Sequence, residues 1–328
     1  MDRTGIAVTG ANGHIGANLC RELTRRGFPV KALVHKNTRG IDSLPLHRVT
    51  GDVMDSGSLR VLLEDVDVVF HLAAVVSIKR EKKEVLEKNF EGTLNVLQAA
   101  VNAGVRKLVH FSSIHALDPE PSDRIMDERR SLALNGRSPY CRSKAMAEKA
   151  VLDAAGKGLD AVILNPTAVI GPYDFAPSLS GRALILMYGG KLPAIVRGGY
   201  DWVDVRDVVG AAIASAGKGR RGERYILSGR WRSLPELCTL ISRLNRKKHP
   251  FVTCSVGTAK IGLPFLKLCS LLMNTEPLYT LDSMRILKKG NRKVSHAKAS
   301  AELGFRPRPL EETLEDTLTW YAENGYLD

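Results

Sequence analysis

Short apolar, β-branched runs alternate with longer amphipathic segments through the first half of the chain. Each run is bounded by glycine or polar residues, as the strands of a buried sheet are. Strands that alternate with helices are typical of βαβ units, so the pattern predicts a parallel sheet covered by helices. The predicted strands are residues 5–9, 30–35, 47–51, 67–72, 107–112 and 160–165.

The segments between these runs have helical periodicity. Residues 14–26 place Ile15, Leu19 and Leu23 at intervals of four, and a glycine follows. This spacing predicts an amphipathic helix with one buried face that ends at the glycine. A longer helix is predicted over residues 82–103.

The rhythm changes after residue 165. Pro, Gly and aromatic residues become frequent over residues 166–200, and another helical pattern follows. We predict an α/β fold of the Rossmann type, a doubly wound parallel sheet with a smaller mixed, mainly helical part that binds the substrate. The dinucleotide-binding domain is predicted over residues 1–165, with 200–228 returning to it, and the substrate-binding part over 166–199 and 229–328.

The composition narrows the class of protein. Of the 328 residues, 44% are hydrophobic and 25% charged, which fits a globular protein and excludes a disordered or collagen-like chain. The apolar stretch at residues 261–273 is too short to cross a bilayer, so we predict a core or pocket-lid helix there and no membrane insertion. Strand-like residues follow the N-terminus at once and leave no room for a signal peptide, so we expect a cytoplasmic protein.

The charge and the cysteines add two negative expectations. The net charge is +13, but the basic residues are spread along the chain in short clusters. This distribution favours a solvated surface over a nucleic-acid partner. The five cysteines are scattered without the spacing of a metal site, so we expect reduced thiols and no metal.

A glycine-rich turn joins the first predicted strand to the first predicted helix. In this turn, which reads TGANGHIG, Gly10 permits a tight turn, Gly13 lets the backbone approach a pyrophosphate, and Gly16 lets the helix pack close to the strand. The start of the helix offers free amides and a positive dipole end to an anion. We therefore predict that a dinucleotide binds at Gly10, Asn12, Gly13, His14, Ile15 and Gly16.

The end of the second predicted strand bears on the choice of cofactor. NAD enzymes usually place a carboxylate there for the ribose, whereas NADP enzymes place a cation for the 2′-phosphate. Here the chain has His35, Lys36 and Arg39, and no carboxylate before Asp42. We favour NADP(H) and keep NAD(H) as the alternative.

A phenol and an ammonium lie four residues apart, on one face of a predicted helix. These are Tyr140 and Lys144, and Ser113 follows the fifth predicted strand. A nearby cation favours the tyrosinate, so we expect Lys144 to lower the pKa of Tyr140 toward the working range. The hydroxyl of Ser113, at the carboxyl end of a parallel strand, could then orient a substrate carbonyl.

With these residues in place, the chain resembles the extended short-chain dehydrogenase/reductase family, the NAD-dependent epimerase/dehydratase group, and within it the dihydroflavonol-reductase-like and hydroxysteroid-dehydrogenase-like branch. The resemblance runs essentially from end to end. Its motifs are TGANGHIG at 9–16, GDV at 51–53, HLAA at 71–74, NFEGTLNVLQAA at 89–100, HFSSI at 110–114, YCRSK at 140–144, NPTAVIGP at 165–172 and WVDVRDV at 202–208.

The resemblance implies a role for each matching residue. Tyr140 would be the general acid, Lys144 its pKa modulator and a ribose ligand, and Ser113 the donor that orients the carbonyl. Asn89 would support the site through backbone contacts. The cofactor would also contact Asp52 and Val53 at the adenine, Leu72, Ala73 and Ala74 along the channel, and Pro166, Thr167 and Ala168 beside the nicotinamide. The chain departs from the family at Asp118, where a glycine is common, and at Asn165, where an arginine is common.

We therefore expect hydride transfer between a nicotinamide cofactor and a carbonyl or alcohol, in the direction of reduction if NADPH is the cofactor. A largely apolar set of candidate contacts suggests a hydrophobic or aromatic carbonyl compound. The candidates are Val75, Val76, His115, Tyr173, Tyr188 and Trp202.

Two other functions stay open. A nucleotide-sugar epimerase or dehydratase with tightly bound NAD would need a basic pocket, for which Arg182, Arg197 and Arg206 are candidates. A protein that senses a dinucleotide without catalysis would not need Ser113, Tyr140 and Lys144. Related enzymes often dimerise through two long helices, so a homodimer is expected through residues 82–103 and 139–155.

Overall fold

The computed structural model describes most of the chain: residues 5–35, 37–75, 82–136, 138–192, 194–245, 251–259, 284, 287 and 291–327. The candidates Lys36 and Val76 and the apolar stretch at 261–273 lie outside the described residues.

The centre of the molecule is a seven-stranded sheet in which every neighbouring pair is parallel. Its strand order, β10-β6-β5-β4-β1-β2-β3, places β1 between β2 and β4, so the chain winds outward in two directions from the middle of the sheet. The predicted α/β fold with a doubly wound parallel sheet is confirmed. The strands are β1 (Ile6–Thr9), β2 (Val30–Val34), β3 (His47–Thr50), β4 (Val68–His71), β5 (Lys107–Phe111), β6 (Ala161–Pro166) and β10 (Arg224–Leu227).

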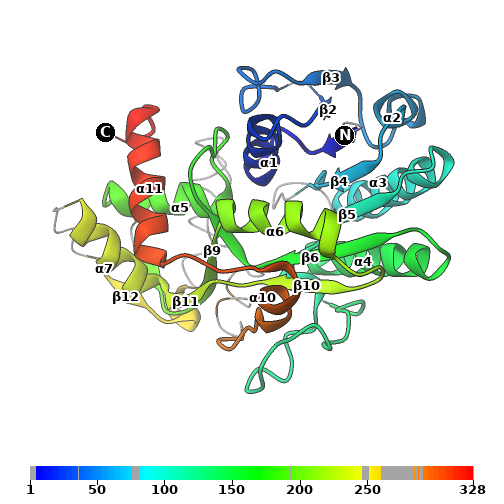
Figure 1. Ribbon diagram of the computed structural model, residues 1–328. Helices are drawn as coiled ribbons and strands as arrows, with labels where there is room; N and C mark the ends of the chain where they lie inside the picture. Colours follow the sequence, from blue (N-terminus) through cyan, green and yellow to red (C-terminus); the bar gives the residue numbers. More distant parts are fainter. Residues whose placement is uncertain are drawn as a thin grey trace.

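Helices cover both faces of this sheet (Figure 1). On one face α1 (His14–Arg25) and α6 (Val205–Lys218) pack on Ile6 and Val8 of β1. On the other face Ala7 of the same strand contributes to a second core. That second core is covered by α2 (Ser56–Leu63), α3 (Lys82–Asn102) and α4 (Pro139–Gly156). Successive β1 side chains point to opposite faces and both are buried, which explains the near-continuous apolar runs in the sequence.

A smaller part lies beside the main sheet, around a third core (Figure 1). It holds a three-stranded sheet of order β11-β9-β7 and a two-stranded one, β12-β8. Its strands are β7 (Ala168–Ile170), β8 (Ile195–Val196), β9 (Gly199–Asp204), β11 (Arg230–Ser233) and β12 (Thr253–Cys254), and its helices are α5 (Leu179–Tyr188), α7 (Leu234–Leu244) and α11 (Leu310–Glu323). The remaining helix, α10 (Ala297–Leu303), packs on α6 and β10 and belongs to the first core of the main sheet. Of the helices that the structure describes, none has the length and apolarity needed to cross a membrane.

Two neutral histidines lie inside the main sheet, on neighbouring strands. The ring of His71 on β4 lies 5.3 Å from that of His110 on β5. His71 makes hydrogen bonds with the hydroxyls of Thr9 (2.8 Å) and Thr93 (3.1 Å). Neither ring nitrogen of His110 has a hydrogen-bond partner among the described residues. Burial lowers the pKa of His71 to about 3 and that of His110 well below its ordinary value.

This burial makes stability depend on pH. Below about pH 6.5, the ordinary pKa of histidine, these two side chains become protonated in the unfolded chain but stay neutral in the folded one. The free energy of unfolding is therefore highest above that pH and falls as the pH drops. Each buried histidine should cost about 1.4 kcal/mol between about pH 7.5 and 5.5. Urea unfolding of His110→Leu should show a pH dependence smaller by about that amount, whereas replacement of the exposed His47 should leave it unchanged. An unchanged pH dependence in His110→Leu would contradict a neutral, buried ring.

Candidate active site

The glycine turn after β1 is compact because two of its glycines have no room for a side chain. Gly10 has a φ of +71°, and a Cβ there would lie 2.7 Å from the backbone nitrogen of Ala73. A Cβ at Gly16 would overlap the carbonyl oxygen of Gly10. The backbone of the turn therefore lies directly against the chain that leaves β4.

Gly13 differs from these two, since the nearest atom to its added Cβ would be the Gly10 oxygen at 3.4 Å. Gly13 is also the N-cap residue of α1, so no side chain satisfies the first amides of the helix. The first turn of α1 contains no acidic residue. Open space, free amides and the positive end of the helix dipole together fit a pyrophosphate.

The adenosine end of this cradle lies at the carboxyl ends of β2 and β3. His35 is exposed, and its Nε2 lies 4.0 Å from Oδ2 of Asp52. Asn12 accepts a hydrogen bond from the amide of Gly40 (2.8 Å), which ties the segment after β2 to the glycine turn. Arg39 is exposed in that segment, with its guanidinium 5.7 Å from the Tyr326 ring. The structure thus places an exposed cation, Arg39, in the segment that Asn12 ties to the glycine turn.

The segment after β4 forms the floor of the channel. The hydroxyl of Thr9 accepts hydrogen bonds from the amides of Leu72 and Ala73, both 3.2 Å long. The Asn89 side chain accepts from the amide of Val75 (2.6 Å) and donates to its carbonyl (3.1 Å). Asn89 also donates to the hydroxyl of Ser143 on α4 (3.1 Å), so it joins the channel to the catalytic helix. Val53 lies further along, where its carbonyl accepts from Asn95 (3.1 Å).

The three predicted catalytic side chains meet where β5 ends and α4 begins. The hydroxyl of Ser113 lies close enough to that of Tyr140 to act on the pKa of the phenol. Lys144 is 6% exposed and donates to the carbonyl of Phe111, the last residue of β5, over 3.0 Å. Ser113 also accepts from the amide of His115 (3.2 Å), which begins a short 3₁₀ helix over Ile114–Ala116.

The electrostatics of the pair differ from the expectation. Burial raises the pKa of Tyr140 to about 12, and the neighbouring hydroxyl of Ser113 opposes this shift. Burial also lowers the pKa of Lys144 to about 8, partly offset by the carboxylate of Glu148. The predicted lowering of the Tyr140 pKa by Lys144 is therefore wrong for the chain alone, because the loss of solvent around the phenol dominates its pKa.

A buried polar group supports the triad from below. Glu148 is fully buried and lies one helical turn beyond Lys144. It accepts from the amide of Asn165 (2.7 Å) and forms an ion pair with Arg224 of β10 (3.3 Å). Asn165, one of the departures from the family pattern, also donates to the carbonyl of Ser113 (3.1 Å), so it holds the backbone of this serine in place.

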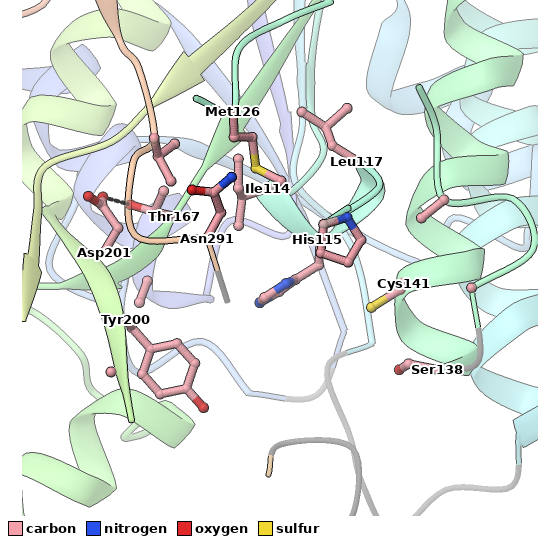
Figure 2. Close-up of a pocket in the computed structure, with 16 residues that line it drawn as sticks. Ile114, His115, Leu117, Met126, Ser138, Cys141, Thr167, Tyr200, Asp201 and Asn291 are labelled. Carbon is pink, nitrogen blue, oxygen red and sulfur yellow. Dashed lines mark hydrogen bonds between the residues drawn. The ribbon is translucent and has the colours of Figure 1, made fainter. Parts of the chain in front are cut away.

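A cavity of about 200 Å³ opens beside the triad, and most of its walls are apolar (Figure 2). His115 and Cys141 lie on one side of it, and Thr167, Tyr200 and Asp201 on the other. Burial lowers the pKa of His115 to about 4, so this ring is neutral. The walls are formed by Ile114, His115, Leu117, Pro119, Met126, Ala133, Gly136, Ser138, Cys141, Thr167, Ala168, Gly199, Tyr200, Asp201, Asn291 and Val294.

The predicted substrate contacts divide into two groups. His115 lies on the cavity, and its ring is 6.3 Å from that of Tyr140. The other aromatic candidates are not among the described wall residues. Trp202 is 3% exposed in the third core, Tyr188 packs against the same core, and Tyr173 lies under the guanidinium of Arg21.

The sequence did not single out Met126, Tyr200, Asp201 or Asn291, which the structure brings to the cavity. These positions come from distant segments, so no local spacing marks them. The one available indication was Asp201, a carboxylate placed among the apolar and aromatic residues of a strand. Of the residues predicted beside the nicotinamide, Pro166 ends β6 while Thr167 and Ala168 reach the cavity.

Comparison with known proteins identifies the family. Residues 6–228 match the model of the NAD dependent epimerase/dehydratase family. The chain belongs to this family, that of the extended short-chain dehydrogenases/reductases. The resemblance noted in the sequence is confirmed, and the chain is an enzyme of this oxidoreductase family.

Curated relatives of this epimerase/dehydratase family member include reductases. Sterol demethylase protein B of Methylococcus capsulatus is 34% identical, with 98% of this chain and 99% of that protein covered. A putative dihydroflavonol 4-reductase of Synechocystis is 30% identical, with 98% and 95% covered.

Solved structures of the same architecture include the crystal structure of gox2253, with a TM-score of 0.86, 29% identity and full coverage of both chains. The dTDP-glucose 4,6-dehydratase of Bacillus anthracis, solved in complex with NAD, has a TM-score of 0.76 at 21% identity, with 98% of this chain and 97% of that chain covered. The second likeness shows the fold alone.

Substitution of Gly13 tests the cradle in this family member. Gly13→Ala should fold with a melting temperature close to that of the wild type, because its Cβ has room. The same methyl would stand where the pyrophosphate approaches, so dinucleotide affinity should fall about tenfold or more. Titration calorimetry with NADPH measures it. Gly10→Ala is the contrasting variant and should lose stability itself, since its φ is +71° and its Cβ would meet backbone. Undiminished affinity in Gly13→Ala would rule out this cradle.

Proposed function

We propose that this enzyme reduces a hydrophobic ketone or aldehyde with NADPH, with Tyr140 as the general acid. The observation that carries the proposal is the proximity of the Tyr140 and Ser113 hydroxyls beside a mainly apolar cavity. Two hydroxyls at one point can both donate to a single carbonyl oxygen as charge develops on it.

Each side chain has a task in this reaction. When bound, the nicotinamide supplies the hydride. Ser113 donates a hydrogen bond to the carbonyl oxygen, and Tyr140 delivers the proton from its hydroxyl. Lys144 holds its ammonium at the end of β5 through Phe111, where it can bind the ribose and favour the phenolate that remains. Asn89 is hydrogen-bonded to Val75 and to Ser143, so it fixes the segment after β4 relative to α4.

The preference for NADPH rests on the charges beyond β2. Residues 35–41 contain no carboxylate to receive a ribose hydroxyl, and Arg39 is exposed there. A 2′-phosphate would accept charge-assisted hydrogen bonds from such a cation. The family as such is NAD-dependent, so the phosphate preference is our proposal for this chain.

The walls of the cavity favour reductase chemistry over nucleotide-sugar chemistry. A sugar diphosphate would need cations near the cavity, and the three arginines considered for this role are absent from its described walls. Arg206 is engaged by Asp204 (2.7 Å) and Asp316 (2.6 Å). Two relatives, a sterol demethylase protein and a putative dihydroflavonol reductase, are named for hydrophobic compounds, which supports a hydrophobic substrate here.

We also propose that the enzyme is a homodimer formed through α3 and α4. These two helices lie side by side on one face of the sheet (Figure 1). A groove runs between them, and Leu94 (40% exposed) and Val101 (56% exposed) contribute apolar surface. Such exposed apolar surface is typical of a protein interface. Light scattering on the purified protein should give twice the chain mass, and a monomer would refute this assembly.

Replacement of the phenol tests the proposed reaction. NADPH oxidation should be followed with a panel of aromatic and alicyclic ketones and aldehydes. Tyr140→Phe should lower kcat by about 10² to 10⁴ while NADPH affinity stays within about twofold, because only the proton donor is lost. Ser113→Ala should lose about tenfold or more. If Tyr140→Phe keeps wild-type turnover on every substrate, the catalytic proposal fails and a dinucleotide-sensing role gains.

The same assay, run with NADPH and with NADH, measures the cofactor preference. Wild-type kcat/KM should be at least about tenfold higher with NADPH than with NADH, and Arg39→Ala should reduce this ratio through NADPH alone. Arg60 on α2, outside the cradle, offers a matched control for loss of one surface cation. A wild type that prefers NADH would overturn the assignment.

A further inference from the structure

We propose that Asp201 is a specificity residue that binds a hydroxyl group of the substrate at the end of the cavity opposite the catalytic triad. The inference rests on the proposed reductase function and deepens it. It narrows the substrate to a hydrophobic carbonyl compound that carries a second, distant hydroxyl group.

The position of Asp201 is fixed by strand pairing. It lies on β9, between β7 and β11, and its backbone is paired with that of Trp231 on β11. Figure 2 shows it on the wall with Thr167 and Tyr200, across the cavity from His115 and Cys141. His115 packs edge-on against Tyr140. The wall that contains His115 and Cys141 is therefore the one next to the proposed catalytic residues.

Among the described residues, only one of the two carboxylate oxygens of Asp201 has a hydrogen-bond partner. Oδ1 accepts from the hydroxyl of Thr167 (2.8 Å) and from the amide of Gly229 (2.7 Å). Oδ2 forms no hydrogen bond or ion pair with the residues that the structure describes, and it is not among the sealed polar atoms. The two bonds to Oδ1 fix the carboxylate in one orientation and leave Oδ2 as an accessible acceptor.

The surroundings make this acceptor costly to leave unpaired. Asp201 is only 9% exposed, and burial raises its pKa to about 6. At neutral pH the group is mostly ionised, so it accepts and does not donate. A buried charge without a partner is unfavourable, and a ligand that supplies a donor there gains binding energy and specificity.

Two neighbouring polar side chains at this end of the cavity, those of Asn291 and Thr167, already have partners in the protein. Asn291 donates to the carbonyl of Arg124 (2.6 Å) and accepts from the amide of Lys293 (2.8 Å). The Thr167 hydroxyl donates a hydrogen bond to Asp201 itself. The ligand must therefore bring the donor. A neutral hydroxyl fits the apolar walls better than an ammonium, because an ammonium would lose its hydration for a single acceptor.

Asp201→Asn gives a sharp test. Thr167 and Gly229 both donate, so the amide oxygen should take the place of Oδ1 and the NH₂ group that of Oδ2. The variant keeps the internal hydrogen bonds and turns the free acceptor into a donor. The substrates are 1-tetralone and its 5-, 6- and 7-hydroxy and methoxy derivatives.

The readout is the ratio of kcat/KM for each hydroxy ketone to that of its methoxy twin. In the wild type this ratio should be about tenfold or more for at least one position. In Asp201→Asn it should fall to about one or below. If no position shows a preference in the wild type, the inference fails without any variant. An unchanged ratio in Asp201→Asn would also overturn it, with the reductase function intact.

A binding measurement separates the two proposals. Titration of wild type, Tyr140→Phe and Asp201→Asn with 2-naphthol and 2-methoxynaphthalene, followed by tryptophan fluorescence, needs no turnover. A preference for the naphthol that survives in Tyr140→Phe and disappears in Asp201→Asn supports the hydroxyl site even if no ketone is reduced. Equal binding of both ligands by the wild type counts against it.

Discussion

The hydrogen bond from the buried ammonium of Lys144 to the carbonyl of Phe111 ties α4 to the end of β5, and the geometry of the site depends on it. One turn earlier on the same helix, Tyr140 is brought to Ser113, which follows the same strand. The helix and the strand therefore position the phenol, the ammonium and the serine together. A shift of α4 along β5 would separate all three.

This arrangement has an electrostatic cost. Taking an ammonium out of water lowers the pKa of Lys144 to about 8, and burial raises that of Tyr140 to about 12. The protein compensates with Glu148, whose negative charge favours the charged lysine, and with Arg224, which balances Glu148 in turn. Asn165 joins this group to the backbone of Ser113, so an amide serves where related proteins often carry an arginine. Buried charges here stabilise a functional geometry at the expense of folding stability.

The sequence allowed prediction where the determinants are local. The first six strands, the glycine turn and the Tyr140 and Lys144 pair follow from spacing along the chain, and the structure has these six strands within about one residue of the predicted bounds. The cavity walls could not be predicted, because Met126, Asp201 and Asn291 come from distant segments. The apolar character of Trp202 and Tyr188 made them candidates for substrate contacts, but the same character suits a side chain in the core, where the structure places both. The pKa of Tyr140 was misjudged because spacing reveals a neighbouring charge but not the loss of solvent.

The two sides of the cavity come from different parts of the fold, and this separation has a consequence for specificity. The catalytic side is built on β5 and α4, where side chains are fixed by hydrogen bonds into the main sheet. The opposite side is built on β9 and the segment near Asn291, where the carboxylate of Asp201 accepts hydrogen bonds from Thr167 and Gly229. Changes on that side can alter the polarity of the cavity without moving the triad.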